Sequence, residues 1–99
     1  MLEITKQVDN TNVVLALEGR LDTMTAPQLQ AEIDGAAGGA TLLTLDLEKL
    51  EYISSAGLRV LLAAQKMMGG QGTMKILHVQ ESVMDIFDVT GFTDILTIE

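Results

Sequence analysis

Two short segments with many apolar residues stand near the start of the chain, with a short polar stretch between them. The segments LEITKQV (2–8) and NVVLALEG (12–19) are rich in β-branched residues. The residues from Asp9 to Asn12 between them tolerate turns and left-handed backbone conformations. This pattern predicts a β-hairpin.

A helical period follows the hairpin. Apolar residues recur there at spacings of three and four: Ala26, Leu29, Ile33 and Ala36. Thr25 stands at the expected N-cap, Pro27 in the first turn and Gln28 three residues after the cap, which matches a capping box. The pattern predicts an amphipathic helix that ends at Gly38-Gly39.

The rest of the chain continues to alternate between strand and helix patterns. The near-continuous apolar run ATLLTLDLEKL (40–50) indicates a strand that is covered on at least one face. The later segments are a helix SAGLRVLLAAQKMMGG (55–70), a strand TMKILHV (73–79), a helix over 82–89 that buries Val83, Ile86 and Phe87, and a closing strand DILTI (94–98) after Gly91.

This order of elements predicts the fold class. Strands that alternate with helices pair in parallel through right-handed crossovers, and the first hairpin adds one antiparallel pair. We therefore expect a single α/β domain over residues 1–99, with a mixed, mostly parallel sheet of about five strands, an N-terminal β-hairpin and three main helices.

Composition and charge argue against several classes of function. The chain is 47% hydrophobic and 20% charged, which is typical of a globular protein. Fourteen acidic and six basic residues give a net charge of −8, so phosphate backbones and anionic lipids are repelled. No basic segment precedes an apolar core at the N-terminus, and no apolar run reaches the roughly 20 residues of a membrane span. We expect a cytoplasmic protein without direct nucleic-acid binding or membrane insertion.

The residue inventory argues against an enzyme. The chain has no cysteine, and its one histidine, His78, falls within a strand pattern with no visible orienting acid, so we interpret it as structural. Asp46 and Glu48 point to one side of a strand and could serve acid–base chemistry, although a solvated sheet end explains them more simply. The glycines of 69–73 follow a helix and precede a strand, unlike a phosphate-binding loop. We expect no cofactor and no metal.

Two adjacent serines stand out in this inventory. Ser54 and Ser55 precede the first turn of the helix over 55–70, where a hydroxyl can accept a backbone hydrogen bond. A simple N-cap explains one serine, but it does not require two. Ala56 and Gly57 behind them are small and leave a hydroxyl open to another protein. The pair is therefore a candidate for a regulatory switch as well as a helix cap.

The stretch YISSAGLRVLL (52–62) resembles the signature of the STAS family, and in particular its free-standing anti-sigma factor antagonists. The stretch LEGRLDTMTAPQL (17–29) resembles the turn that precedes the family's first helix, and IFDVTGFTDIL (86–96) resembles its last helix and glycine-aromatic turn. The resemblance covers essentially the whole chain, and its first stretch is the most specific.

The resemblance implies roles for individual residues. The phosphorylated serine of the family falls on Ser55, while Ser54, where relatives often have aspartate, is the alternative site. The family's turn aspartate matches Asp22. The expected partner-binding residues are Asp22, Thr23, Ser54, Ser55, Ala56, Gly57 and Arg59.

The resemblance also implies a mechanism, which is a partner switch. The unmodified domain would bind an anti-sigma factor, or a serine kinase of the histidine-kinase-like fold, and phosphorylation would release it. A PP2C-type phosphatase would then restore the unmodified form. The alternative is a constitutive STAS scaffold, such as the small subunit of a lipid-transport complex, that docks without phosphorylation. A small-ligand module is a third possibility, but it lacks a recognisable loop.

Overall fold

The computed structural model describes residues 1–99 and confirms the predicted fold class. The elements in chain order are β1 (Leu2–Asp9), β2 (Asn12–Leu21), α1 (Ala26–Ala36), β3 (Leu42–Ile53), α2 (Ser55–Gly69), β4 (Thr73–Leu77), α3 (Glu81–Thr90) and a short 3-10 helix (Phe92–Asp94). None of these helices is long and apolar enough to cross a membrane.

The sheet has four strands in the order β1-β2-β3-β4. The β1–β2 pair is antiparallel and forms the predicted hairpin, whose turn includes Asn10 with a φ of 56°. Asparagine is one of the few residues besides glycine that adopt this left-handed conformation readily. The β2–β3 and β3–β4 pairs are parallel, as the alternation of strands and helices predicts.

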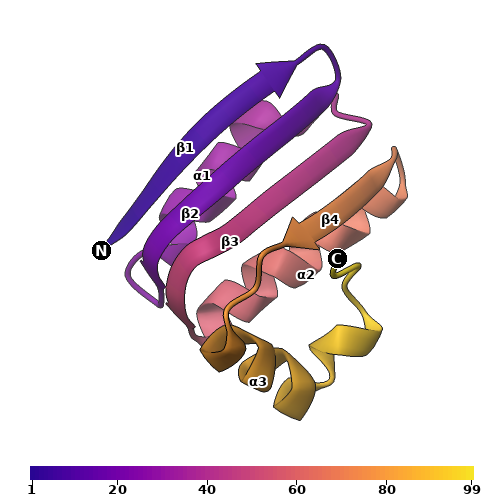
Figure 1. Ribbon diagram of the computed structural model, residues 1–99. Coiled ribbons are helices and arrows are strands. Elements are labelled where there is room, and N and C mark those ends of the chain that lie inside the picture. The colour runs from indigo at the N-terminus through magenta and orange to yellow at the C-terminus, as the bar shows by residue number, and fades with distance from the viewer.

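The helices lie unevenly around the sheet. Helices α1 and α2 cover one face, the opposite face carries no helix, and α3 lies beyond the end of β3 (Figure 1). Because strand side chains alternate between faces, Leu43, Leu45 and Leu47 all point towards α1 and α2 and are fully buried. Val83 and Phe87 of α3 join the same core, whereas Ile86, predicted to be buried, is half-buried.

The segment predicted as a closing strand is reduced to one bridge. Gly91 adopts a φ of 80° and ends α3, and the chain then turns into the 3-10 helix. The helix-type bond from the Leu96 amide to the Phe92 carbonyl keeps the start of the segment out of the sheet. Only Ile98 pairs with β4, in parallel with Ile76. The fifth strand is therefore a single-residue contact at the sheet edge.

The predicted capping box at α1 does not form. The backbone at Thr25 is helical, with φ −103° and ψ −16°, and its side chain does not cap the helix. The Thr25 hydroxyl instead accepts a 2.8 Å hydrogen bond from the Asp22 amide and donates one of 2.9 Å to the Arg20 carbonyl. Gln28 donates across to the Leu2 carbonyl at 3.0 Å. The side chains of Thr25 and Gln28 therefore connect the helix to the sheet. Pro27 lies in the first turn of the helix, as predicted.

Candidate functional site at the start of helix α2

Strands β2 and β3 end side by side and place two loops at the same edge of the sheet. Leu21 and Ile53 are register partners at the strand ends, and the Ser54 amide donates a 2.9 Å hydrogen bond to the Leu21 carbonyl. Asp22 and Ser54 therefore leave the sheet next to each other, where the ends of β2 and β3 lie side by side. The structure thus brings together the two stretches that sequence analysis linked.

Gly57 allows the first turn of α2 to lie directly on the ends of these strands. A Cβ atom at this buried position would stand 2.7 Å from Leu21 Cγ and 2.8 Å from Ile53 Cγ1. Any side chain would have to displace two fully buried neighbours. A glycine is therefore required for this close approach, which holds the start of α2 against the ends of β2 and β3.

The two serines have different structural positions. Ser54 is the N-cap of α2, with an extended backbone, and its Oγ accepts a hydrogen bond of 3.4 Å from the Gly57 amide. Ser54 is half-buried, whereas Ser55, the first residue of the helix, is exposed. Because Ser54 supplies the cap, the Ser55 hydroxyl is left accessible at the surface.

Asp22 organises the loop that faces the serines. Its Oδ1 accepts hydrogen bonds from the Met24 amide at 3.0 Å and the Thr25 amide at 3.1 Å, and it shares the Thr25 hydroxyl proton, at 3.2 Å, with the Arg20 carbonyl. Partial burial acts to raise the pKa of the Asp22 carboxyl, but the hydrogen bonds from Thr25 and Met24 outweigh it and hold the pKa below its usual range. A charged Asp22 therefore keeps the β2–α1 loop in one conformation.

The ordered loop presents an apolar side chain that sequence reasoning missed. Met24 is 87% exposed, although Asp22 fixes its backbone amide. This methionine falls in neither a helical nor a strand period, so the sequence pattern predicts no role for it. The signal that could have identified it is a large apolar residue inside a turn sequence, next to the aspartate that the family resemblance selects. Thr23 beside it is also exposed.

The remaining predicted partner-binding residues lie on α2. Ala56 is half-buried, and Arg59 is exposed one turn after Ser55. Arg20 lies at the end of β2, where its guanidinium stands 4.4 Å from the centre of the Tyr52 ring on β3. Among these residues, Ala56 and Arg59 follow the serines directly in the first turns of α2.

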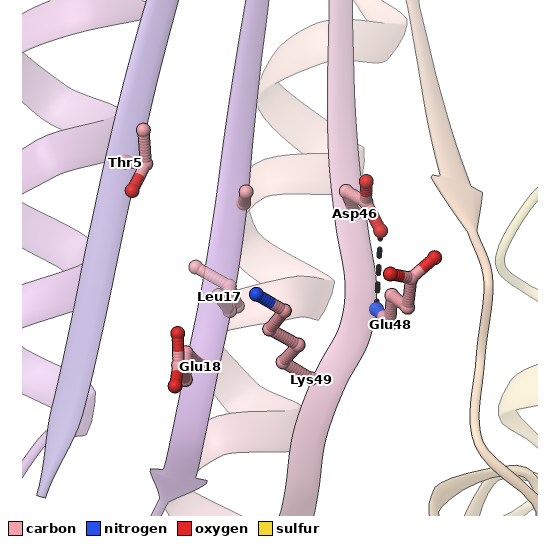
Figure 2. Close-up of a pocket in the computed structure, with 7 residues that line it drawn as sticks. Thr5, Leu17, Glu18, Asp46, Glu48 and Lys49 are labelled. Carbon is pink, nitrogen blue, oxygen red and sulfur yellow. Dashed lines mark hydrogen bonds between the residues drawn. The ribbon is translucent and has the colours of Figure 1, made fainter.

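A concave region lies away from this site, on the uncovered face of the sheet. It is a shallow depression of about 250 Å³ lined by Thr5, Ala16, Leu17, Glu18, Asp46, Glu48 and Lys49 (Figure 2). The β2–β3 register shifts here, between Ala16 and Glu18, and the Glu48 amide donates a 3.1 Å hydrogen bond to Asp46 Oδ1. The Asp46 carboxylate is therefore partly used to support an irregular strand.

His78 differs from its predicted environment. Strand β4 ends at Leu77, and His78 follows it with a φ of 58°. Its Nδ1 lies 3.0 Å from Asp46 Oδ1, so the orienting acid that sequence analysis did not find is present. Sequence reasoning could not pair them because the contact crosses from β3 to the end of β4. The His78 side chain is 56% exposed and lies outside the depression.

Comparison with known proteins assigns the family. The family model described as "Mlab, STAS domain" matches residues 4–97, nearly the whole chain. The chain therefore belongs to the STAS domain family, as its signature stretch predicts.

The curated relatives indicate which type of STAS domain this chain is. The chain is 35% identical over 88 residues to BtrV of Bordetella bronchiseptica, whose name marks it as an anti-sigma factor antagonist, covering 87% of this chain and 76% of that protein. It is 31% identical over 94 residues to the anti-sigma-B factor antagonist of Bacillus subtilis, covering 94% and 85%. The protein is thus a STAS domain of the anti-sigma factor antagonist type.

Solved structures share the fold. An anti-sigma factor antagonist from Mycobacterium paratuberculosis matches with a TM-score of 0.89 at 21% identity, over 99% of this chain and 85% of that one. The phosphorylated form of the Bacillus cell fate determinant SpoIIAA matches with a TM-score of 0.74 at 22% identity, over 100% and 91%.

Proposed function

We propose that this chain, acting as one STAS domain over residues 1–99, is an anti-sigma factor antagonist controlled by phosphorylation of Ser55. The observation that carries the proposal is that the two serines have different structural roles. Ser54 caps α2, whereas Ser55 is exposed at the first helical residue. A kinase can therefore reach Ser55 without removing the cap that holds the helix start.

The fold should survive the modification. A phosphate adds about −1.5 to −2 charges, and the start of a helix favours negative charge. The unphosphorylated form of SpoIIAA matches this chain with a TM-score of 0.75 and its phosphorylated form with 0.74. In that relative, both forms keep the architecture that this chain adopts.

Binding to the partner should not survive it. A dianion at the centre of a close protein interface must be desolvated or must hold the partner away, and an unpaired buried charge costs several kcal/mol. A loss of about 4 kcal/mol is roughly a thousandfold in affinity. Phosphorylation of Ser55 would therefore release the partner.

The surface formed by Asp22, Thr23, Ala56 and Arg59 around the serines is the proposed contact, whereas Gly57, also expected there, is buried beneath it. Its partner would be an anti-sigma factor or a serine kinase of the histidine-kinase-like fold, and a PP2C-type phosphatase would reverse the modification. The relatives named as anti-sigma factor antagonists support this type of partner. The domain would act in the cytoplasm.

A binding titration tests the switch. The probe is the histidine-kinase-like serine kinase whose gene lies nearest in the same genome, measured by calorimetry. We expect Ser55→Ala to bind like the unmodified protein and Ser55→Asp to bind at least a hundredfold more weakly. Ser54→Ala and Ser54→Asp are the matched controls one residue away. Equal affinities for Ser55→Ala and Ser55→Asp would reject the switch, and release by Ser54→Asp alone would move it to Ser54.

A constitutive scaffold is the second candidate, because the matching family model is described as "Mlab, STAS domain". Such a subunit would use the same surface without modification. Mass spectrometry of the protein from its native cells separates the two functions: a phosphate on Ser55 or Ser54 supports the switch, and complete absence of phosphate under all growth conditions supports the scaffold.

A further inference from the structure

Helix α2 differs in charge from the rest of this acidic chain. It contains Arg59 and Lys66 and no acidic residue, so its side chains carry two positive charges in a protein of net charge −8. The other two long helices are acidic: α1 holds Glu32 and Asp34, and α3 holds Glu81, Asp85 and Asp88. The helix that begins at Ser55 is thus the cationic one.

These charges share one exposed stripe with Ser55. Residues four apart on a helix lie on the same face, about 5–6 Å apart at Cβ. The exposed positions of α2 before its terminal glycine follow this spacing closely: Ser55, Arg59, Ala63 and Lys66. Arg59 is therefore the charged side chain nearest to Ser55 along this stripe.

Arg59 has no carboxylate partner in the folded chain. The ion pairs of the structure are Lys6 with Glu32 at 3.9 Å, Lys75 with Glu99 at 3.8 Å, and His78 with Asp46 at 3.0 Å. The guanidinium is exposed and free to rotate about its side-chain bonds. It can turn back along the helix towards Ser55 without breaking an existing contact.

We propose that Arg59 is the intramolecular ligand of the phosphate on Ser55. The proposal rests on the modification of Ser55 proposed above. An arginine offers a planar fork of donors that binds two phosphate oxygens at once, a geometry that lysine cannot reproduce. The pair would form between positions i and i+4 of α2, and it needs no rearrangement of the backbone.

The consequence is a double change at the contact surface. In the unmodified protein, Arg59 presents a free positive charge beside Ser55. In the modified protein, the phosphate adds negative charge and also occupies Arg59. One modification would then remove the cation that the unmodified surface offers to a partner, as well as introduce a repulsive group.

The test uses phosphoserine installed at position 55 by genetic encoding, so no kinase or partner is needed. The phosphorus NMR signal is followed through the second ionisation of the phosphate. A nearby cation favours the dianion, so the midpoint in the wild-type protein should lie about 0.5 pH units below that of Arg59→Gln. Arg59→Lys should fall between them, because it keeps the charge but loses the fork.

Lys66→Gln is the matched control. It removes the same charge from the same stripe, but it lies roughly 16 Å from Ser55 along the helix axis, beyond the Debye length of about 10 Å at 0.1 M salt. Its midpoint should equal that of the wild type, and circular dichroism should show all variants folded. Equal midpoints for the wild type and Arg59→Gln would overturn the proposal, as would equal shifts for Arg59→Gln and Lys66→Gln.

This outcome is separate from the fate of the switch itself. The titration reports a contact within the phosphorylated chain, whereas the calorimetric comparison of Ser55→Ala and Ser55→Asp reports release of a partner. An Arg59-dependent midpoint with no effect of Ser55→Asp on binding would reject only the switch. Release by Ser55→Asp with an Arg59-independent midpoint would reject only the phosphate contact.

Discussion

The Ser54 amide and the Leu21 carbonyl are joined by a 2.9 Å hydrogen bond that ties the start of α2 to the end of β2. This bond continues the parallel β2–β3 pairing by one residue beyond the register pair of Leu21 and Ile53. The β2–α1 loop and the first turn of α2 are therefore held as one surface. A partner that contacts both stretches meets a site that is already assembled in the free protein.

Replacing each of the two serines by alanine should have different effects on the stability of the domain. Ser54→Ala removes the N-cap hydrogen bond to Gly57, and loss of such a cap typically costs about 0.5–2 kcal/mol. We expect the lower end of this range, because the bond is 3.4 Å long. Ser55→Ala should change the free energy of unfolding by no more than about 0.5 kcal/mol from the wild-type value, as is usual for exposed positions. Urea unfolding of both variants measures the difference, and an equal loss for the two would contradict the assigned roles.

Gly57→Ala should destabilise the domain despite the better helix propensity of alanine. The added Cβ would stand 2.7 Å from Leu21 Cγ and 2.8 Å from Ile53 Cγ1, inside a fully packed region. Overpacking of this kind costs about 1–3 kcal/mol, and replacing a helical glycine returns at most about 1 kcal/mol. We expect a net loss of about 1–2 kcal/mol in the free energy of unfolding, measured in urea.

Gly69→Ala is the matched control for Gly57→Ala. Gly69 is the last residue of the same helix, and no atom lies within 4 Å of the Cβ that alanine would add there. This variant should be as stable as the wild type or more stable by up to about 1 kcal/mol. If Gly57→Ala behaved like Gly69→Ala, the close contact between α2 and the strand ends would not exist in solution.

Much of this architecture could be predicted from local patterns. The hairpin around Asn10, the period of α1 and the glycines after α2 each carry their signal within a few neighbouring residues. The missed features depend on contacts across the fold. Thr25 matches a capping box in sequence, but the carbonyl of Arg20 and the amide of Asp22 lie close enough to take its hydroxyl. Such competition is decided by tertiary structure.

The candidate site also combines features that local sequence predicts with features that depend on contacts across the fold. The spacing of Ser54, Ser55 and Gly57 could be read from the sequence, because a helix start has local rules. The exposure of Met24 could not, since it depends on the turn that Asp22 closes through its carboxylate. The pairing of His78 with Asp46 also escaped prediction, because the contact joins strand β3 to the residue that follows β4. The helix-start pattern and the family resemblance indicated the candidate site, and packing determined which side chains face outward.

The order of the β2–α1 loop should depend on pH through Asp22. Hydrogen bonds to its carboxylate lower the pKa in the folded state, so the stabilising contribution is complete above the unfolded value of about 3.9. It is lost as the pH falls through the lowered folded value. The amide NMR signals of Met24 and Thr25 should therefore titrate with a midpoint below about 3.9. Asp22→Asn should abolish this titration, and a midpoint above 3.9 in the wild type would contradict the hydrogen-bonded carboxylate.

Met24 should contribute to partner binding without contributing to folding. Its side chain is 87% exposed, so replacement by glutamine removes almost no buried surface, while the bond from its amide to Asp22 is kept. A large apolar side chain held on an ordered loop can enter a pocket of the partner at little cost in backbone entropy. We expect Met24→Gln to weaken binding of the serine kinase at least tenfold, with an unchanged melting temperature.

Val89 offers the comparison that decides whether this effect is specific to the site. It is also 87% exposed, but it lies at the C-terminal end of α3, away from the first turn of α2 (Figure 1). Val89→Thr removes an equally exposed apolar group, so any general loss of surface hydrophobicity would affect both variants alike. Weakened binding for Met24→Gln alone places the contact on the β2–α1 loop. Equal weakening by Val89→Thr, or no weakening by Met24→Gln, would remove Met24 from the partner-binding surface.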